Sequence, residues 1–369
     1  MRPNLLIQTI YTMGWYEYLI TSLSFLLCLV IVLLSSRVLR LCGRTDDLTA
    51  VQAMHLVQTP RLGGIAIFGT LCLSVVLVSV SLSWVNVNLI IATSLIFFIG
   101  IAEDIGIRMS PAKRMLAVVC SSLLVIWSSG VWLPRTGIPM LDIAAEHWIV
   151  GIPITVLVMA GISNGFNLVD GVNGLASFVG IVTTVALSQI AEISGYEAMV
   201  HYLILFASGI FGFFLLNYPF GLIFLGDAGA YTIGFVLSWC GIAILVNEPD
   251  VSAWAILLTF FWPIADTLLA IFRRLNRKTD LTVPDRLHFH QMVMRALEIC
   301  FLGRTRRHIS NPLTTLILAP FVIMPPLVGV KLWDQDSYAF LAALIFSIMF
   351  FVVYIFSGFF VRKYRLRSS

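Results

Sequence analysis

Two long apolar runs decide the fold: VHYLILFASGIFGFFLLN at residues 200–217 and LGDAGAYTIGFVLSWCGIAILV at residues 225–246. A helix needs about 20 mostly apolar residues to cross the hydrocarbon core of a membrane. The first run contains no Asp, Glu, Lys or Arg, and the second contains only Asp227, near its start. Both runs therefore predict transmembrane helices.

Further apolar runs lie on both sides of these two. We therefore predict an all-α integral membrane protein, a polytopic bundle of about eleven transmembrane helices. The expected spans lie near residues 16–36, 64–83, 86–102, 115–133, 149–163, 176–192, 200–217, 225–246, 252–272, 313–333 and 338–361. No A-x-A-like cleavage site follows the first span, so we expect it to remain as a mature helix.

The composition excludes several other classes of protein. Of the 369 residues, 59% are hydrophobic and only 11% are charged, whereas soluble domains have roughly 45–50% apolar and about 25% charged residues. Six cysteines in a chain of this length are too few for a disulfide-rich secreted scaffold. A water-soluble domain, a disordered chain and a collagen-like repeat are excluded by the same numbers.

The basic residues predict the orientation. With the spans above, the segments 37–63, 103–114, 164–175, 218–224, 273–312 and 362–369 fall on one side and hold twenty of the 23 Lys and Arg residues. Only Arg2, Arg135 and Lys331 fall on the other side. The positive-inside rule therefore predicts a periplasmic N-terminus and a cytoplasmic C-terminus. We expect residues 1–369 to form a single polytopic membrane domain, with a catalytic site formed by its cytoplasmic loops.

Polar motifs gather at the predicted cytoplasmic ends of the helices. They are TPRLGG at 59–64, AEDIG at 102–106, NGFNLVDGVNGLA at 164–176, NYPFGLIFLGDAGA at 217–230 and PDRLHFHQ at 284–291. Ionisable groups near a membrane are functional candidates, because each needs a partner or water.

The richest motif carries Asn164, Asn167, Asp170 and Asn173, each three residues after the one before. The opening members of this series would lie on one face of a helical turn. The glycines between them let the backbone approach a ligand closely. We interpret the stretch as a recognition loop. The alternative is capping of two helix ends, which needs fewer polar groups than the motif contains.

The acidic residues allow two interpretations each. Glu103 and Asp104 are adjacent, so on a helix their side chains diverge by about 100° and would not chelate one ion together. They could serve two different tasks, proton acceptance and binding of a cation, or form a solvated turn. Asp227 could be a helix cap or a ligand of Mg²⁺, which takes only one or two protein carboxylates. Asp266, two turns before Arg273 and Arg274, is interpreted as part of a structural ion pair or a helix bend.

The basic loop contains Arg286, His288 and His290. Two histidines separated by one residue do not share a helix face, which argues against a zinc pair. Arg286 can bind phosphate with its planar fork, and the imidazoles can donate hydrogen bonds to it. Arg61, beside two glycines, forms a second basic corner.

These motifs, in this order, resemble the polyprenyl-phosphate N-acetylhexosamine-1-phosphate transferases, glycosyltransferase family 4. The resemblance extends from about His55 to Gln291 and is most specific in NGFNLVDGVNGLA and FLGDAGA. It implies a Mg²⁺-dependent phosphotransferase, with Mn²⁺ as a substitute metal. The donor would be a UDP-N-acetylhexosamine such as UDP-GlcNAc and the acceptor undecaprenyl phosphate, giving UMP and the lipid-pyrophosphate-sugar that starts O-antigen or another envelope polysaccharide.

The resemblance also assigns roles by position. Glu103 and Asp104 stand at the family's acidic pair, and Asp227 and Asn167 are the expected metal ligands. Catalytic roles are expected for Glu103, Asp104, Asp227 and His288. Substrate binding is expected of Asn164, Asn167, Asp170, Asn173, Asn217, Lys113, Arg61, Arg286 and His290.

Three positions depart from the family pattern. Glu103 replaces an Asp and has a longer arm, Asn173 replaces a frequent Asp, and Gln291 stands where a His is common. LHFHQ favours the simpler-sugar branch over the muropeptide transferases of peptidoglycan synthesis, which remain an alternative.

Two hypotheses from other functional classes also remain open. One is a polytopic transporter, and the other is a scaffold for glycan assembly that has lost catalysis. The expected setting is the bacterial inner membrane, with the active site facing the cytoplasm. The expected partners are the two substrates and the lipid bilayer, with no nucleic acid, and a homodimer only as a family-level expectation.

Overall fold

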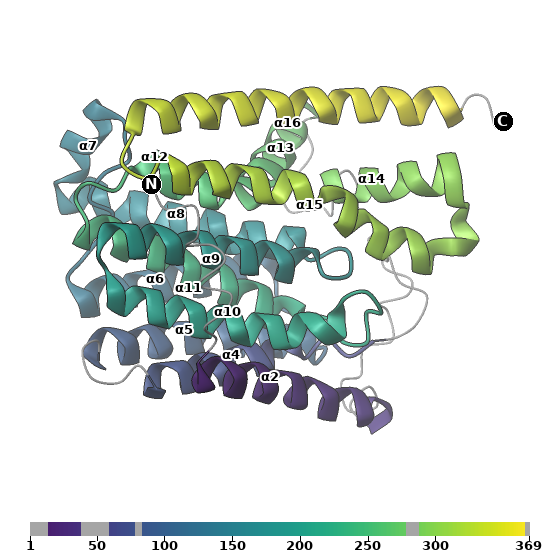
Figure 1. Ribbon diagram of the computed structural model, residues 1–369, viewed down its shortest axis with the longest axis horizontal. Coiled ribbons are helices and arrows are strands. Elements are labelled where there is room, and N and C mark those ends of the chain that lie inside the picture. The colour runs from purple at the N-terminus through teal and green to yellow at the C-terminus, as the bar shows by residue number, and fades with distance from the viewer. Residues whose placement is uncertain (1–13, 38–58, 78–82, 278–287, 366–369) are drawn as a thin grey trace.

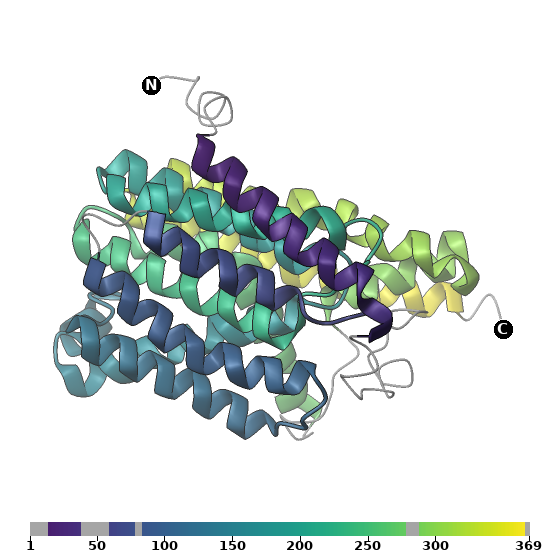
Figure 2. The same cartoon turned by 90° about the horizontal axis from the view of Figure 1, so that it is seen from below.

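The computed structural model describes residues 14–37, 59–77, 83–277 and 288–365, and within these ranges the chain is helical with no β-strand. Figures 1 and 2 show most of the helices running side by side along one direction, as expected of a membrane bundle. The long helices are α2 (Trp15–Leu33), α4 (Gly63–Leu77), α5 (Ser83–Asp104), α6 (Pro111–Ser129), α8 (Trp148–Val169), α9 (Leu175–Ser194), α10 (Glu197–Asn217), α11 (Gly226–Asn247), α13 (Phe261–Arg277), α15 (Arg307–Lys331) and α16 (Asp336–Arg365). The short elements are α7 (Pro139–Ala145), α12 (Ala253–Thr259), α14 (Phe289–Leu297), a π-helical turn at Glu298–Leu302 and a 3-10 turn at Arg304–Arg306.

The prediction of an all-α, multi-pass membrane protein is confirmed. Among the described residues, nine helices are long and apolar enough to span a membrane, and each matches one of the predicted spans. The span predicted at 64–83 corresponds to α4, whose described part is shorter, at 15 residues. The weakest predicted span, at 149–163, lies within α8, a full helix of 22 residues.

One predicted span is wrong as a continuous helix. The segment 252–272 is divided into α12 and α13, which meet at Phe260 with a bend of 81°. Pro263 lies in the first turn of α13, where a missing N–H is tolerated but continuation from the preceding helix is disfavoured. The bend turns α13 away from the direction of α12, and α13 packs mainly on α8.

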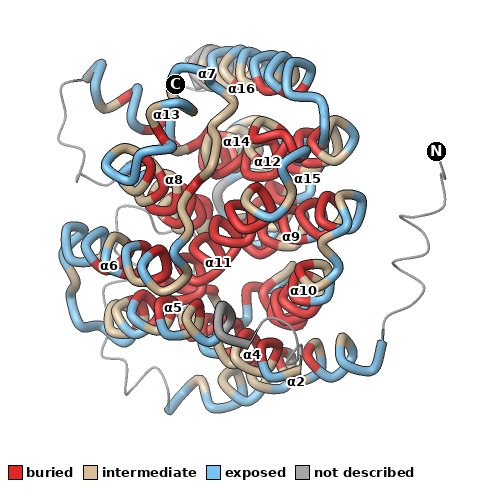
Figure 3. The backbone as a smooth tube through the Cα atoms, turned by 90° about the vertical axis from the view of Figure 1, so that its left-hand side faces the viewer, coloured by how far each residue is buried: buried red, intermediate tan, exposed pale blue. Residues whose placement is uncertain are grey.

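Helix α11 forms the centre of the bundle. Every residue from Gly226 to Leu245 is buried, and α11 packs against α4, α5, α8 and α9. In Figure 3 it is the red segment enclosed by the other helices. A helix that is apolar all round belongs in the core of a protein, so the one acid near its start, Asp227, is placed inside the bundle and not at its lipid surface.

The helix ends follow ordinary capping rules. Ser110 accepts a hydrogen bond from the main-chain N–H of Lys113 at 3.3 Å, with Pro111 in the first turn of α6. Gly195, with φ of 99°, closes α9 in the left-handed conformation. These caps define where α6 begins and where α9 ends.

Candidate functional site

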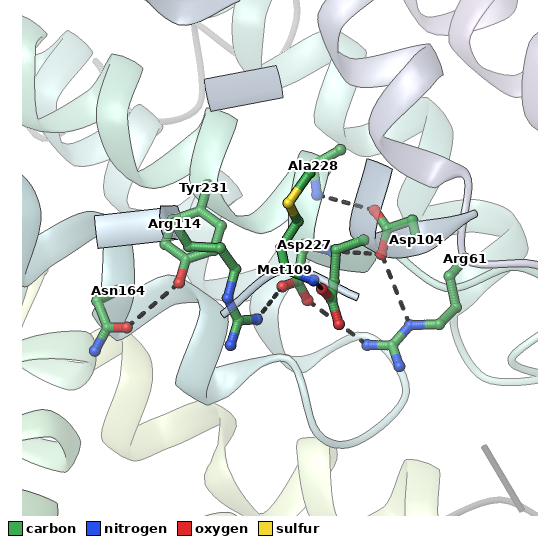
Figure 4. A network of polar contacts seen from close by, with 9 residues as sticks. Arg61, Asp104, Met109, Arg114, Asn164, Asp227, Ala228 and Tyr231 are labelled. Carbon is green, nitrogen blue, oxygen red and sulfur yellow. Dashed lines mark hydrogen bonds and ion pairs between the residues drawn. The ribbon is translucent and has the colours of Figure 1, made fainter. Parts of the chain in front are cut away.

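The N-terminus of α11 is the meeting point of two acids from other helices. Asp104, the last residue of α5, accepts hydrogen bonds from the main-chain N–H groups of Asp227 and Ala228, at 2.9 and 3.0 Å (Figure 4). Asp170, just after α8, receives a main-chain hydrogen bond from Gly226. The first N–H groups of a helix lack partners within it and form the positive end of its dipole. The two carboxylates therefore hold the start of α11 from two sides.

Asp227 itself extends from this start and contacts two arginines. Arg114 of α6 donates a short hydrogen bond to Oδ2 of Asp227, and Arg61 lies 3.9 Å from Oδ1. Arg61 also lies 3.9 Å from Oδ1 of Asp104, so it bridges the two acids (Figure 4). The side chain of Asp227 is 7% exposed. Three acids and two arginines thus surround one point at the end of the bundle.

The backbone at Gly226 allows this close approach. Its φ is +75°, a left-handed conformation that a side chain disfavours. A Cβ atom there would lie 2.4 Å from the carbonyl oxygen of Arg61 and 2.5 Å from Oδ2 of Asp104. The glycine is therefore needed for both the turn and the contact with these two residues.

Tyr231, one turn after Asp227, connects α11 to the asparagine motif. Its hydroxyl donates to Oδ1 of Asn164 at 3.5 Å and is also hydrogen-bonded to Asn167. Burial raises the pKa of Asp170 to about 6, while Arg61 acts in the opposite direction. The spacing of three places Asn164, Asn167 and Asp170 beside the start of α11, as we expected for one face of a helical end.

Asn173 and Asn217 lie close to this group but bind main chain. Asn217 accepts from the N–H of Gly174 at 2.7 Å and donates to the carbonyl of Ile223 at 2.7 Å. Asn173 donates to the carbonyl of Pro219 at 2.9 Å, and its own N–H donates to Oδ1 of Asn311 at 2.7 Å. Both side chains are buried, at 7% and 5% exposure. In this structure they join the loop after α8 to the loop after α10.

The histidine motif begins α14. Nδ1 of His288 lies 2.9 Å from Oδ2 of Asp266, and the N–H of Phe289 donates to Oδ1 of the same carboxylate at 3.1 Å. His290 stacks beside His288 with ring centroids 5.7 Å apart. A Cβ on Gly171 would lie 2.3 Å from Nε2 of His290, so this ring packs directly on the asparagine loop. Burial lowers the pKa of His290 to about 4, and Asp266 opposes that shift.

Other predicted residues lie in different surroundings. Glu103 is half-buried and accepts from the N–H of Met109 at 2.6 Å. Lys113 is exposed. Arg286 lies outside the described residues.

Sequence reasoning missed two residues of the site, Arg114 and Tyr231, and gave Asp266 only a structural role. The signal for Arg114 was its place in the first turn of α6, next to Lys113. The signal for Tyr231 was its place one turn after Asp227. Asp266 was interpreted as part of a structural ion pair or a helix bend, and its partners are Nδ1 of His288 and the N–H of Phe289. For Asp266, the signal in the sequence was an acidic residue inside an apolar run.

The donors at the start of α11 fit a hard divalent cation. Among the described residues, no group of three or more His, Cys, Asp or Glu side chains is arranged to hold a metal. Mg²⁺ does not need such a group, since it is held through one or two carboxylates together with substrate phosphates and water. Asp104, Asp170 and Asp227 bring three carboxyl groups, whose oxygens are the ligand type that Mg²⁺ prefers, to this point beside Arg61 and Arg114.

Comparisons with known proteins agree with one another. A family model described as glycosyl transferase family 4 matches residues 86–245, which include α6, the asparagine motif and most of α5 and α11. A Bacillus subtilis (strain 168) protein described as a probable undecaprenyl-phosphate N-acetylglucosaminyl 1-phosphate transferase is 26% identical over 274 residues, or 73% of this chain and 75% of the relative.

Two further relatives are described as undecaprenyl-phosphate alpha-N-acetylglucosaminyl 1-phosphate transferases. The Yersinia pestis protein is 24% identical over 309 residues, which is 80% of each chain. The Salmonella typhi protein is 25% identical over 299 residues, covering 75% of this chain and 78% of the relative.

Proposed function

This chain belongs to glycosyl transferase family 4, and we propose that it transfers an N-acetylated sugar 1-phosphate from a UDP-sugar to undecaprenyl phosphate. It is a membrane phosphotransferase, and the acceptor in the names of its relatives is undecaprenyl phosphate. The observation that carries the proposal is the site around Asp227, where two arginines and two further acids meet at a helix N-terminus. Such a site suits the binding of a diphosphate together with a divalent cation.

The reaction joins two anions, so neutralisation and positioning supply most of the catalysis. In the proposed step, an oxygen of undecaprenyl phosphate attacks the β-phosphorus, which carries the sugar. A new P–O bond forms there, and the bond from the β-phosphorus to the bridging oxygen breaks. UMP leaves with the electron pair, and the lipid-pyrophosphate-sugar remains.

The acids take different roles in this proposal. Both oxygens of Asp104 are engaged by the start of α11, so we assign Asp104 to holding Asp227 in place. Glu103 is half-buried beside it and can accept a proton from a protonated acceptor phosphate. Arg61 and Arg114 are well placed to offset phosphate charge. A covalent aspartyl-phosphate route would instead leave a phosphorylated carboxylate in a single turnover.

A Mg²⁺ ion is part of the proposal, with Mn²⁺ as a substitute. Asp227 and Asn167 would hold it, because both are neighbours of Tyr231 at the start of α11. When bound, the ion would neutralise the diphosphate and polarise the phosphorus that is attacked. His288, Asn164 and Asp170 remain the proposed contacts of the nucleotide sugar.

We propose UDP-GlcNAc or a related UDP-N-acetylhexosamine as the donor, in line with the names of the relatives. The start of an O-antigen or another cell-envelope polysaccharide is the proposed use of the product. UDP-sugars are cytosolic, and the acceptor phosphate lies at the membrane surface, so the site should face the cytoplasm from the inner membrane. The basic residues predicted on that side support this orientation.

The test is UMP release by the purified protein in detergent, with undecaprenyl phosphate, MgCl₂ and a panel of labelled UDP-sugars. Asp227→Asn should lower turnover by at least about 100-fold while the melting temperature stays close to wild type. Asp250→Asn is the matched control, because this exposed acid follows the opposite end of α11. Retained activity in Asp227→Asn, or activity of the wild type that withstands EDTA, would contradict the metal role.

A further inference from the structure

Asp266 lies inside an apolar segment and has no role in the step above. It is fully buried, at 0% exposure, on α13. A buried carboxylate is costly unless hydrogen bonds compensate for its lost hydration. Its partners are Nδ1 of His288 at 2.9 Å and the N–H of Phe289 at 3.1 Å. Asp266 therefore directs both oxygens at the start of α14.

These two contacts fix how the His288 ring is held. An ionised carboxylate can only accept hydrogen bonds, so the proton of the contact must reside on Nδ1 of the imidazole. His288 makes no other side-chain hydrogen bond among the described residues, so Nε2 on the opposite edge of the ring has no partner there, while the main-chain carbonyl accepts from the N–H of Met292 at 3.0 Å. The contact of Phe289 with the second oxygen sets the position of the backbone next to that ring.

The surroundings of α14 restrict it further. Phe289 is inserted among aromatic rings, with centroid distances of 5.5 Å to Trp262 and 4.9 Å to Phe350. Arg273 donates to the hydroxyl of Tyr354 at 3.2 Å, which joins α13 to α16 beside this cluster. The start of α14 is thus held by α13 and α16 together.

On the other side, this segment meets the asparagine loop. His290 packs on Gly171, directly after Asp170. Both ring nitrogens of His290 are buried without a hydrogen-bond partner among the described side chains and main chain, and Nδ1 lies 4.0 Å from Asp266. His288 is stacked on this ring, so it lies at the boundary between α14 and the loop that follows α8.

We propose that Asp266 is a positioning residue: it fixes the tautomer and orientation of His288, so that Nε2 of His288 engages a phosphate oxygen of the nucleotide sugar. This inference rests on the proposed function. It treats Asp266 as acting through His288 alone, without contact with either substrate. The bend at Phe260 turns α13 against α8, and in this position the carboxylate of Asp266 reaches the start of α14.

A double-mutant cycle tests the inference. Asp266→Asn should lower kcat for UMP release about 100-fold, because the amide can present its NH₂ to Nδ1 and reverse the tautomer of His288. The KM for the UDP-sugar should change less than about 3-fold, since most contacts with the donor remain. In the His288→Ala background, Asp266→Asn should have no further effect on kcat. Asp266→Glu should recover part of the loss seen in Asp266→Ala.

Asp142→Asn is the matched control. Asp142 also accepts two hydrogen bonds, from the main-chain N–H and the hydroxyl of Thr136, at 2.5 and 2.6 Å. It lies on α7. This replacement should leave kcat unchanged. Melting temperatures of all variants identify any that lose the fold. An equal loss of kcat for Asp266→Asn with and without His288 would overturn the inference, as would unchanged kcat in the single variant.

A second measurement does not depend on turnover. In protein carrying ¹⁵N-labelled histidine, the resonances of His288, assigned by their loss in His288→Ala, should show a proton on Nδ1 in wild type and not in Asp266→Asn. If the wild type releases no UMP from any UDP-sugar, the proposed function fails, and this spectrum still decides whether Asp266 fixes His288. A wild-type ring protonated only on Nε2 would refute the positioning role in either case.

Discussion

The carboxylate of Asp104 caps the helix that carries Asp227, although 123 residues separate Asp104 from Asp227 in the chain. The contact joins the end of α5 to the start of α11, and it depends on close packing of the two helices. Asp170 binds the preceding N–H of the same helix. The acid proposed to hold the metal is therefore positioned by two other acids, and this arrangement leads to the predictions below.

Loss of the Asp104 cap should affect both folding and turnover. Asp104→Ala leaves two buried N–H groups without their partner, at a cost of about 1–3 kcal/mol each. Asp104→Asn can keep only one of the two hydrogen bonds, so its losses of stability and turnover should lie between those of wild type and Asp104→Ala. Both should lower the melting temperature in detergent and the rate of UMP release. Glu103→Gln is the comparison, since its amide oxygen can still accept from Met109, and an equal thermal shift in that variant would contradict the prediction.

Arg114 should matter more than its neighbour Lys113. Arg114 is bonded to Asp227, whereas Lys113 is exposed. Arg114→Ala should lower kcat about 100-fold, because it removes a fixed cation beside the carboxylate and the phosphates. Arg114→Lys should recover only part of the lost kcat, because an ammonium group lacks the forked geometry of the guanidinium. Lys113→Ala, assayed for UMP release under the same conditions, should be the milder change, and a reversed order would refute the assignment.

The contact between α5 and α11 should not tolerate a methyl group. A Cβ on Gly100 would lie 2.4 Å from Cα of Ala228, so Gly100→Ala must separate the two helices and should cost at least about 2 kcal/mol. Gly161→Ala is the matched control, since nothing lies within 4 Å of its added Cβ. That change should be neutral or stabilising by up to about 1 kcal/mol. Thermal unfolding of the two variants in the same detergent provides the comparison.

In mild acid His290 should reduce the stability of the protein, whereas Asp170, whose pKa is raised to about 6, acts in the opposite direction. Burial holds the pKa of His290 at about 4, whereas histidine in an unfolded chain titrates near 6.5. Between these values the unfolded chain binds a proton that the folded chain excludes, so stability is lost as the pH falls. At pH 5 the loss should be about 2 kcal/mol.

Melting temperatures at pH 7 and pH 5 give the measurement. From pH 7 to pH 5, wild type should lose stability relative to His290→Gln, while His308→Gln, at an exposed position, should change as wild type does. An equal change in wild type and in His290→Gln would contradict the prediction for His290.

Much of the site could be predicted from residues that lie near one another in the chain. The spacing of Asn164, Asn167 and Asp170 placed them on one helical end, and that end lies beside the start of α11. Asp227 was singled out with two interpretations, a cap and a ligand. The structure shows that Asp104 and Asp170 bind the N–H groups at the start of α11, which leaves the carboxylate of Asp227 directed to Arg61 and Arg114.

The amino-acid sequence by itself determined that the chain is a multi-pass helical membrane protein, because the hydrophobicity of about 20 consecutive residues is a local property. It also determined which polar motifs lie at helix ends. Only the tertiary structure decided that Arg114 rather than Lys113 contacts Asp227, that α12 and α13 bend at Phe260, and that Asp266 binds His288. Those contacts depend on how each helix is rotated and packed against partners distant in the chain, and no local pattern of residues records that rotation.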